Sequence, residues 1–147
     1  MKDKTMIHAH IKETGESLFA VNIEVSGHTI KGDEPVDAHG GNLGPAPYDL
    51  LTAALGECTA MTVRWYAKQH EWPLDTVEVN MTHEKVDGVD VFGKEIIVHG
   101  DALTDEQRTK LVEIAAKCPV QRTLESEIVI HTRAPSVTIA KKQESSQ

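Results

Sequence analysis

The sequence has neither a long apolar run nor a cluster of basic residues. No segment approaches the roughly 18 apolar residues that a membrane span needs, and the N-terminus leads into alternating residues rather than an apolar leader. The formal net charge is -8, which repels phosphate backbones and anionic lipid surfaces. We therefore expect a cytoplasmic protein that has neither nucleic acid nor membrane among its partners.

Cysteine is scarce too, because Cys58 and Cys118 are the only two in the chain. Two cysteines without a C-x-x-C spacing cannot build the disulfide framework of a small secreted domain, and they are a poor basis for structural zinc. His8 and His10 lie close together, but no carboxylate or cysteine stands beside them at ligand spacing. We therefore expect no metal site. The chain also lacks the glycine-rich motifs that bind dinucleotides and nucleotide phosphates.

Aromatic residues make up only 4% of the chain, so its core must be mostly aliphatic. The length of 147 residues and the hydrophobic share of 39% are typical of one globular domain. We place this single domain at residues 1–138 and expect a polar C-terminal tail at residues 139–147.

Hydrophobic patterns and turn signals predict strands in the first third, a long central helix, two more strands, a second helix and a last strand. The predicted strands cover residues 6–11, 17–25, 28–31, 75–85, 91–102 and 127–132. The predicted helices cover residues 48–70 and 104–118, and a loop rich in glycine and proline at 32–47 precedes the first. This order indicates an α+β domain with antiparallel pairing rather than a doubly wound parallel sheet.

Each cysteine lies on the apolar stripe of a predicted helix. The first stripe consists of Leu51, Leu55, Cys58, Thr62 and Trp65, and the second consists of Leu111, Ile114, Ala115 and Cys118. Packing of the two stripes would bring the sulfurs into one core layer, but the spacing alone does not fix their distance. Apolar stripes also hold inert cysteines, so a purely structural role stays open.

The ends of the second helix bear on the reactivity of its cysteine. A capping box from Thr104 to Gln107 predicts where the helix starts, and Pro119 predicts that it ends near Cys118. A cysteine at the carboxyl end of a helix is a poor thiolate, because the helix dipole opposes negative charge there. Cys58, in the middle of the first helix beside Glu57, is therefore the better candidate nucleophile.

Several motifs in the loop, in the first helix and around the second cysteine form a recognisable set. They are Asp33-Glu34-Pro35, Gly40-Gly41, Gly44-Pro45-Ala46-Pro47-Tyr48-Asp49-Leu50-Leu51, Ala53-Ala54-Leu55-Gly56-Glu57-Cys58-Thr59 and Cys118-Pro119-Val120. With these motifs the chain resembles the OsmC/Ohr family, named for osmotically inducible protein C and the organic hydroperoxide resistance protein. The resemblance covers about residues 5 to 135 and is nearest to the OsmC-like subgroup.

The resemblance implies an OsmC/Ohr-like fold, with antiparallel sheets around a long central helix, and an intertwined homodimer with active sites at its interface. It also implies a peroxidase that reduces organic hydroperoxides through cysteine and needs no cofactor. Cys58 matches the cysteine that attacks the peroxide and becomes a sulfenic acid, and Cys118 matches the cysteine that condenses with it to a disulfide. A dithiol or a lipoylated protein would act as the reductant.

The chain departs from the family pattern around the thiolate. Peroxidases of the family carry an arginine in the N-terminal strands and a glutamate ahead of the first cysteine, whereas this chain has no arginine before Arg64 and has Tyr48 in place of the glutamate. The candidates for supporting the thiolate are Asp49, Glu57 and Arg122, with Lys31 and Arg64 as further cations. The alternative is an OsmC-like binding module that has lost peroxidase activity and binds a small apolar ligand or a thiol carrier.

Overall fold

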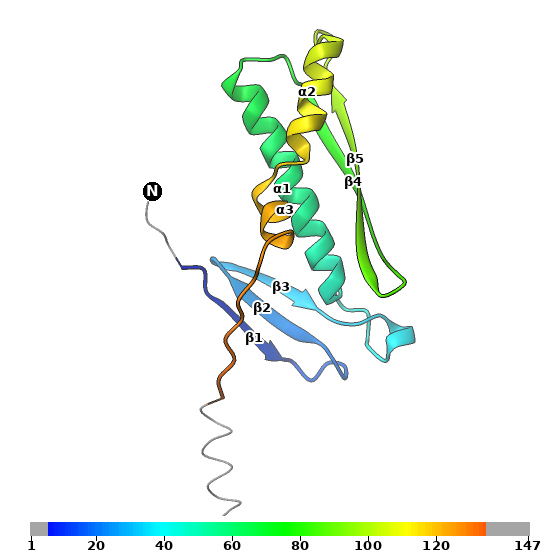
Figure 1. Ribbon diagram of the computed structural model, residues 1–147. Coiled ribbons are helices and arrows are strands. Elements are labelled where there is room, and N and C mark those ends of the chain that lie inside the picture. Colours follow the sequence, from blue (N-terminus) through cyan, green and yellow to red (C-terminus); the bar gives the residue numbers. More distant parts are fainter. Residues whose placement is uncertain (1–5, 135–147) are drawn as a thin grey trace, which may run out of the picture.

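The computed structural model describes residues 6–134 and contains two antiparallel sheets and a long central helix (Figure 1). The elements are β1 (Ala9–Glu13), β2 (Val21–Val25), β3 (His28–Gly32), the 3-10 helix η1 (Val36–Ala38), α1 (Pro47–Gln69), β4 (Thr76–Val86), β5 (Val89–His99), α2 (Asp105–Ala115) and α3 (Pro119–Leu124). The expected α+β class is confirmed. The tail predicted at 139–147 lies outside the described residues.

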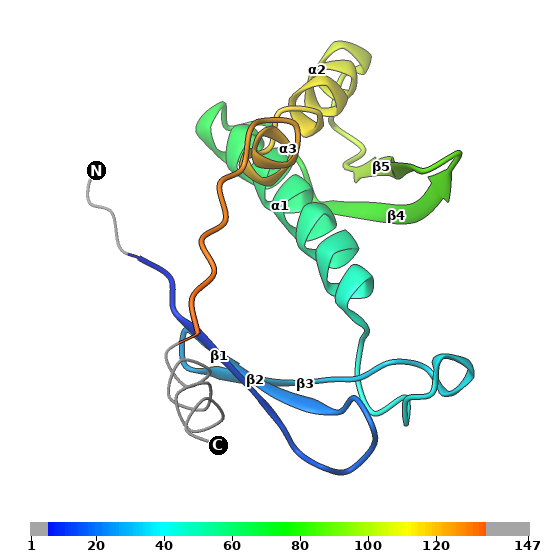
Figure 2. The same ribbon diagram turned by 60° about the horizontal axis from the view of Figure 1, so that its bottom comes forward.

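The N-terminal sheet is a meander in the order β1-β2-β3. Ile11, Ile23 and Ile30 are paired across the three strands and therefore share one face. This sheet lies beyond the amino end of α1 and away from the second sheet (Figures 1 and 2). Ile11 is 55% exposed as a result, so the apolar face of the sheet is largely uncovered.

The strand predicted from Ser17 begins only at Val21, because Ser17 turns inward to the loop that leads to α1. Its hydroxyl donates to both carboxylate oxygens of Asp33 at 3.0 and 2.9 Å. Burial raises the pKa of Asp33, but hydrogen bonds from the Glu34 amide, the Ser17 hydroxyl and the Leu43 and Gly41 amides hold the pKa below its usual value. Asp33 thus organises the loop as a buried, ionised acceptor.

Helix α1 begins at Pro47, one residue before the predicted start, because proline is favoured in the first helical turn. The side chain of Asp49 accepts the Ala46 amide at 2.9 Å and completes the start of the helix. The predicted apolar stripe is displaced by about one residue. The fully enclosed side chains of α1 belong to Leu55, Thr59, Val63 and Ala67, whereas Trp65 is 63% exposed.

Close approach of the second sheet explains this displacement. A Cβ on Gly56 would lie 2.7 Å from Met81 Cγ, so only glycine lets β4 pack this tightly against α1. The hairpin of β4 and β5 and the helix α2 enclose a mainly aliphatic core made of Val63, Ala67, Leu74, Leu103, Leu111 and Ala115. The buried face of α1 is therefore selected by small side chains rather than by the largest apolar ones.

Two predictions near the C-terminus are wrong. Helix α2 starts with the expected capping box at Thr104 but ends at Ala115, and Cys118 is the N-cap of a new helix, α3. The reason is that Cys118 adopts an extended backbone ahead of Pro119, which begins α3. The strand predicted at 127–132 is absent, because within residues 6–134 no strand pairs with this segment. The segment instead leads from α3 toward the N-terminal sheet (Figure 2).

Candidate active site

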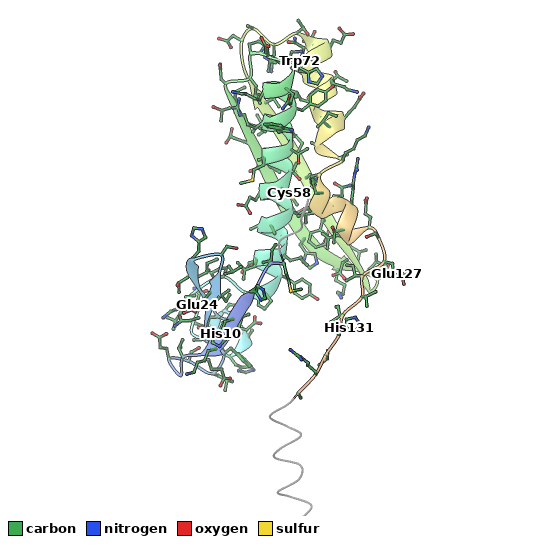
Figure 3. All side chains as sticks on the ribbon, turned by 90° about the vertical axis from the view of Figure 1, so that its left-hand side faces the viewer. His10, Glu24, Cys58, Trp72, Glu127 and His131 are labelled. Atoms are coloured by element: carbon green, nitrogen blue, oxygen red, sulfur yellow. The ribbon has the colours of Figure 1, made fainter. Side chains whose placement is uncertain are left out.

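Cys58 lies midway along α1 and is half-buried (Figure 3). Its sulfur accepts the Val120 amide of α3 at 3.4 Å. The side chain also borders an open groove of about 630 Å³ between α1 and α3. The groove is lined by the apolar residues Ala54, Met61, Trp65, Pro119 and Val120 and by the charged residues Glu57, Lys117 and Arg122, together with Thr62. Cys58 is therefore the sulfur that a molecule entering from solvent can reach.

Cys118 is fully buried and receives hydrogen-bond donors from three elements. As the N-cap of α3 it accepts the Gln121 amide at 3.3 Å. The Thr59 hydroxyl of α1 lies 3.6 Å from its sulfur, and Lys94 Nζ of β5 lies 3.9 Å away. This environment is built to hold negative charge on the sulfur.

The two sulfurs lie next to each other. The Cys58 thiol is a hydrogen-bond partner of the Cys118 sulfur, and both cysteines are free rather than bridged. The sequence had left the distance between them open. The packing of α1 against α3, not against the end of α2, brings the pair together.

The electrostatics of Cys118 overturn the expectation that it is a poor thiolate. Burial raises the pKa of Cys118, but the Gln121 amide, the Thr59 hydroxyl, the Cys58 thiol and the charge of Lys94 lower it by more. The net result is a pKa below the ordinary value for cysteine. The helix-dipole argument failed because Cys118 lies at the amino end of α3 and not at the carboxyl end of α2.

Lys94 is the residue of this site that the sequence analysis missed. It lies on the same face of β5 as Phe92, Ile96 and Val98. Of these three residues, Ile96 and Val98 pack against the core. Its ammonium group donates to the Ala115 carbonyl at 2.8 Å at the end of α2. The sequence does carry a signal for this residue, because Lys94 lies among apolar neighbours on one face of the strand.

The residues predicted to support a thiolate occupy other places. Asp49 is exposed and caps α1, while Glu57 and Arg122 border the Cys58 groove on the solvent side. Lys31 pairs with Glu16 in the N-terminal sheet. Arg64 donates to the backbone carbonyls of residues 74 and 75, each at 2.9 Å. Within the described chain, Lys94 is the cation that reaches a cysteine sulfur.

A second cavity, of about 760 Å³, lies between α1, β5, α2 and α3. Its walls are mostly apolar, and Lys94, Asp90 and Glu125 supply the charges. The apolar residues include Leu51, Leu55, Phe92, Ile96, Val112 and Leu124. Lys94 and Gln121, which donate to the Cys118 sulfur, also line this cavity, and its volume can take an alkyl group.

Over residues 6–134, no three histidine, cysteine, aspartate or glutamate side chains come close enough together to hold a metal ion. None of the helices in this part of the chain combines the length and the apolar composition needed to cross a bilayer.

The fold and the site together define a small α+β protein with a reduced dithiol between its central helix and α3. The family model for OsmC-like protein matches residues 39–133. The chain therefore belongs to the OsmC-like family, as its motifs indicated. No curated protein sequence gives a significant match.

Solved structures confirm the OsmC/Ohr-like fold. An OsmC-like protein from Mycoplasma pneumoniae is 20% identical with a TM-score of 0.64, and the match covers 86% of this chain and 90% of that one. The organic hydroperoxide resistance protein OhrB of Bacillus subtilis is 20% identical with a TM-score of 0.58, covering 84% and 93%. An OsmC-like protein from Vibrio cholerae is 16% identical with a TM-score of 0.64, covering 87% and 99%.

Proposed function

We propose that this protein is a thiol-dependent peroxidase that reduces organic hydroperoxides through Cys58 and Cys118. The observation that carries the proposal is the contact between two free sulfurs, one open to a groove and the other buried and surrounded by donors. Membership of the OsmC-like family and the name of the Bacillus subtilis relative support a peroxide-related redox role. The apolar walls of the groove suit an alkyl hydroperoxide.

The first half of the reaction takes place at Cys58. Its thiolate attacks one peroxide oxygen, the O–O bond breaks, and the alkoxide leaves as an alcohol after taking a proton. The sulfur is oxidised by two electrons to a sulfenic acid. Cys118 then attacks Cys58, an S–S bond forms, the S–O bond breaks, and the hydroxide leaves as water after taking a proton.

A reductant completes the cycle by thiol exchange. A small dithiol or a lipoylated protein supplies two electrons and two protons and is itself oxidised to a disulfide. Because Cys118 is fully buried, the incoming thiolate attacks the Cys58 sulfur from the groove and displaces Cys118. Free thiols of this kind fit the reducing conditions of the cytoplasm, where we place the protein.

The active unit in this proposal is an intertwined homodimer. Support comes from apolar surface that one copy leaves uncovered in three separate segments. Ile11 of the N-terminal sheet, Trp65 of α1 and Ile130 after α3 are all more than half exposed. The extended segment around Ile130 has no strand partner within residues 6–134, so a second copy supplies the pairing and the cover.

The test is the reaction of reduced protein with one equivalent of cumene hydroperoxide, followed by intact mass and peptide mapping. We expect the loss of two hydrogens and a Cys58–Cys118 crosslink that a dithiol reverses. The variant C58S should consume no peroxide, and C118S should accumulate a sulfenic acid on Cys58. Full turnover by C58S would refute the assignment of Cys58.

The mostly apolar cavity between α1, β5, α2 and α3 favours one alternative function, a binding module for a small apolar ligand or a thiol carrier. This alternative predicts that both thiols survive cumene hydroperoxide unchanged. It also predicts that a fatty-acyl probe binds the wild-type protein and that Leu55→Arg, which places charge in the cavity wall, abolishes binding.

A further inference from the structure

The donors around the two sulfurs are unequally distributed. Cys118 has the Gln121 amide, the Thr59 hydroxyl, the Cys58 thiol and the Lys94 ammonium group near its sulfur. Within residues 6–134, the only donor recorded at Cys58 is the amide of Val120. An anion is most stable where donors and positive charge converge, and in this dithiol that place is Cys118.

The surroundings of Lys94 hold its ammonium group close to the Cys118 sulfur. Its ammonium group is anchored on the carbonyl of Ala115, the last residue of α2, which lies three residues before Cys118. Asp90 and Glu125 border the same cavity, but within the described part of the chain no carboxylate lies within 4.0 Å of Lys94 Nζ. The charge of Lys94 is therefore directed at sulfur rather than neutralised by an ion pair.

We propose that Lys94 fixes the negative charge of the dithiol on Cys118, so that Cys118 serves both as the base that takes the Cys58 proton and as the thiolate that resolves the sulfenic acid. Lys94 acts through Cys118 and is a positioning residue. The inference rests on the proposed peroxidase function. It assigns to Lys94 the place of the N-terminal arginine, which this chain lacks.

The proton balance of the dithiol supports these two roles for Cys118. In this proposal the dithiol starts with one proton and one negative charge, and Lys94 keeps the charge on Cys118. As the peroxide enters the groove, the proton passes to Cys118 and the Cys58 thiolate attacks oxygen. The departing alkoxide takes this proton back to become an alcohol, which returns Cys118 to the thiolate. Cys118 can then attack the sulfenic acid without a separate deprotonation, and hydroxide leaves.

Charged groups on the other elements cannot take the place of Lys94. Lys117 and Arg122 border the groove of Cys58, and both are exposed to solvent that screens their charge. Glu57 borders the same groove and carries the opposite sign. Lys94 therefore supplies the positive charge on the buried side of the pair.

The experiment titrates the thiolate of Cys118 by its ultraviolet absorbance in a C58S background, where Cys118 is the only thiol. We expect Lys94→Met to raise the titration midpoint by about one pH unit or more, as loss of an opposite charge at this distance does. Lys94→Arg should keep the midpoint low. Lys110→Met is the matched control, because it removes the same charge from α2, where the lysine lies beside Glu113.

An unchanged midpoint in Lys94→Met, or an equal rise in Lys110→Met, overturns the inference. Should Lys94→Met fail to fold, carbon NMR of the cysteine Cβ in the wild-type protein decides, and a Cys118 midpoint at or above about 8.5, the value for free cysteine, overturns it as well.

A kinetic measurement separates this inference from the proposed function. In the two-cysteine protein, Lys94→Met should shift the pH profile of peroxide consumption upward by the same amount and recover the wild-type rate at high pH. An unshifted profile refutes the role of Cys118 as the base. Absence of peroxide consumption by the wild-type protein refutes the peroxidase function, whereas the titration still reports where the charge lies.

Discussion

Replacement of Thr59 by valine tests how the buried sulfur is stabilised. Thr59 is fully buried, and its hydroxyl has one hydrogen and two acceptors, the Leu55 carbonyl at 2.7 Å and the Cys118 sulfur at 3.6 Å. When Cys118 carries a negative charge, the hydrogen turns to sulfur, because a charged acceptor binds it more strongly than a carbonyl does. Valine has nearly the same shape but no hydroxyl.

The expected size of the effect follows from these distances. A hydrogen bond to a charged group contributes about 1.5–3 kcal/mol, and the long contact to sulfur and the competing carbonyl place Thr59 at the lower end. We therefore expect Thr59→Val to raise the pKa of Cys118 by about one unit, which corresponds to about 1.4 kcal/mol. Wherever the pH lies well below this pKa, the thiolate fraction and the rate of peroxide consumption should fall by about tenfold.

The assay is the same thiolate titration, with the rate of peroxide consumption measured in parallel. Thr52→Val is the matched control. The Thr52 hydroxyl donates to the carbonyl four residues before it, that of Tyr48 at 2.7 Å, just as Thr59 does to Leu55, but within residues 6–134 it donates to no sulfur. Folding stability should change by no more than about 1 kcal/mol in either variant. An unchanged midpoint in Thr59→Val would show that the hydroxyl gives its hydrogen to Leu55 and that the reasoning is wrong.

Two further predictions concern stability. Because the pKa of Cys118 is lower in the folded chain than in the unfolded chain, the unfolded chain binds more protons between the two values, so the free energy of unfolding should rise with pH through this window and fall as pH drops through the folded pKa. Denaturant titrations over this range should show the rise in the wild-type protein and not in C118A. Leu111→Ala should cost about 2–5 kcal/mol because it empties a fully buried site. Val112→Ala, at a position that is 47% exposed, should cost far less in the same denaturant titrations, and equal losses would contradict the assigned core.

Local signals predicted the features of this fold that depend on a few neighbouring residues. Pro47 begins α1 because it lacks the amide that would be unpaired there, and the Thr104 capping box begins α2 because it satisfies amides within one turn. The inward stripe of α1 was displaced because it depends on the close approach of β4 to Gly56, and β4 comes from a separate part of the sequence. The strand expected around Ile130 failed for a similar reason, since a strand requires a partner that the hydrophobic pattern does not name.

The site shows the same division between local and long-range information. The motifs identified both cysteines, but their distance depends on where α2 ends, and Pro119 was interpreted only as the end of a helix when it is also the start of one. That single reading placed Cys118 at the wrong helix terminus and reversed the sign of the dipole argument.

The sequence is sufficient to predict the position of Lys94 but not its role. Phe92, Lys94 and Ile96 are two positions apart and share one face of β5. This spacing places a charge on the core side of the strand, where a charge requires a partner. The sequence alone does not name the acceptor, because the acceptor lies 24 residues further along the chain. With Cys118 as the N-cap of α3, its sulfur becomes that acceptor, so the half-buried lysine and the buried thiol are partners. A site without the N-terminal arginine can therefore still hold a thiolate, provided that its charge rests on the second cysteine.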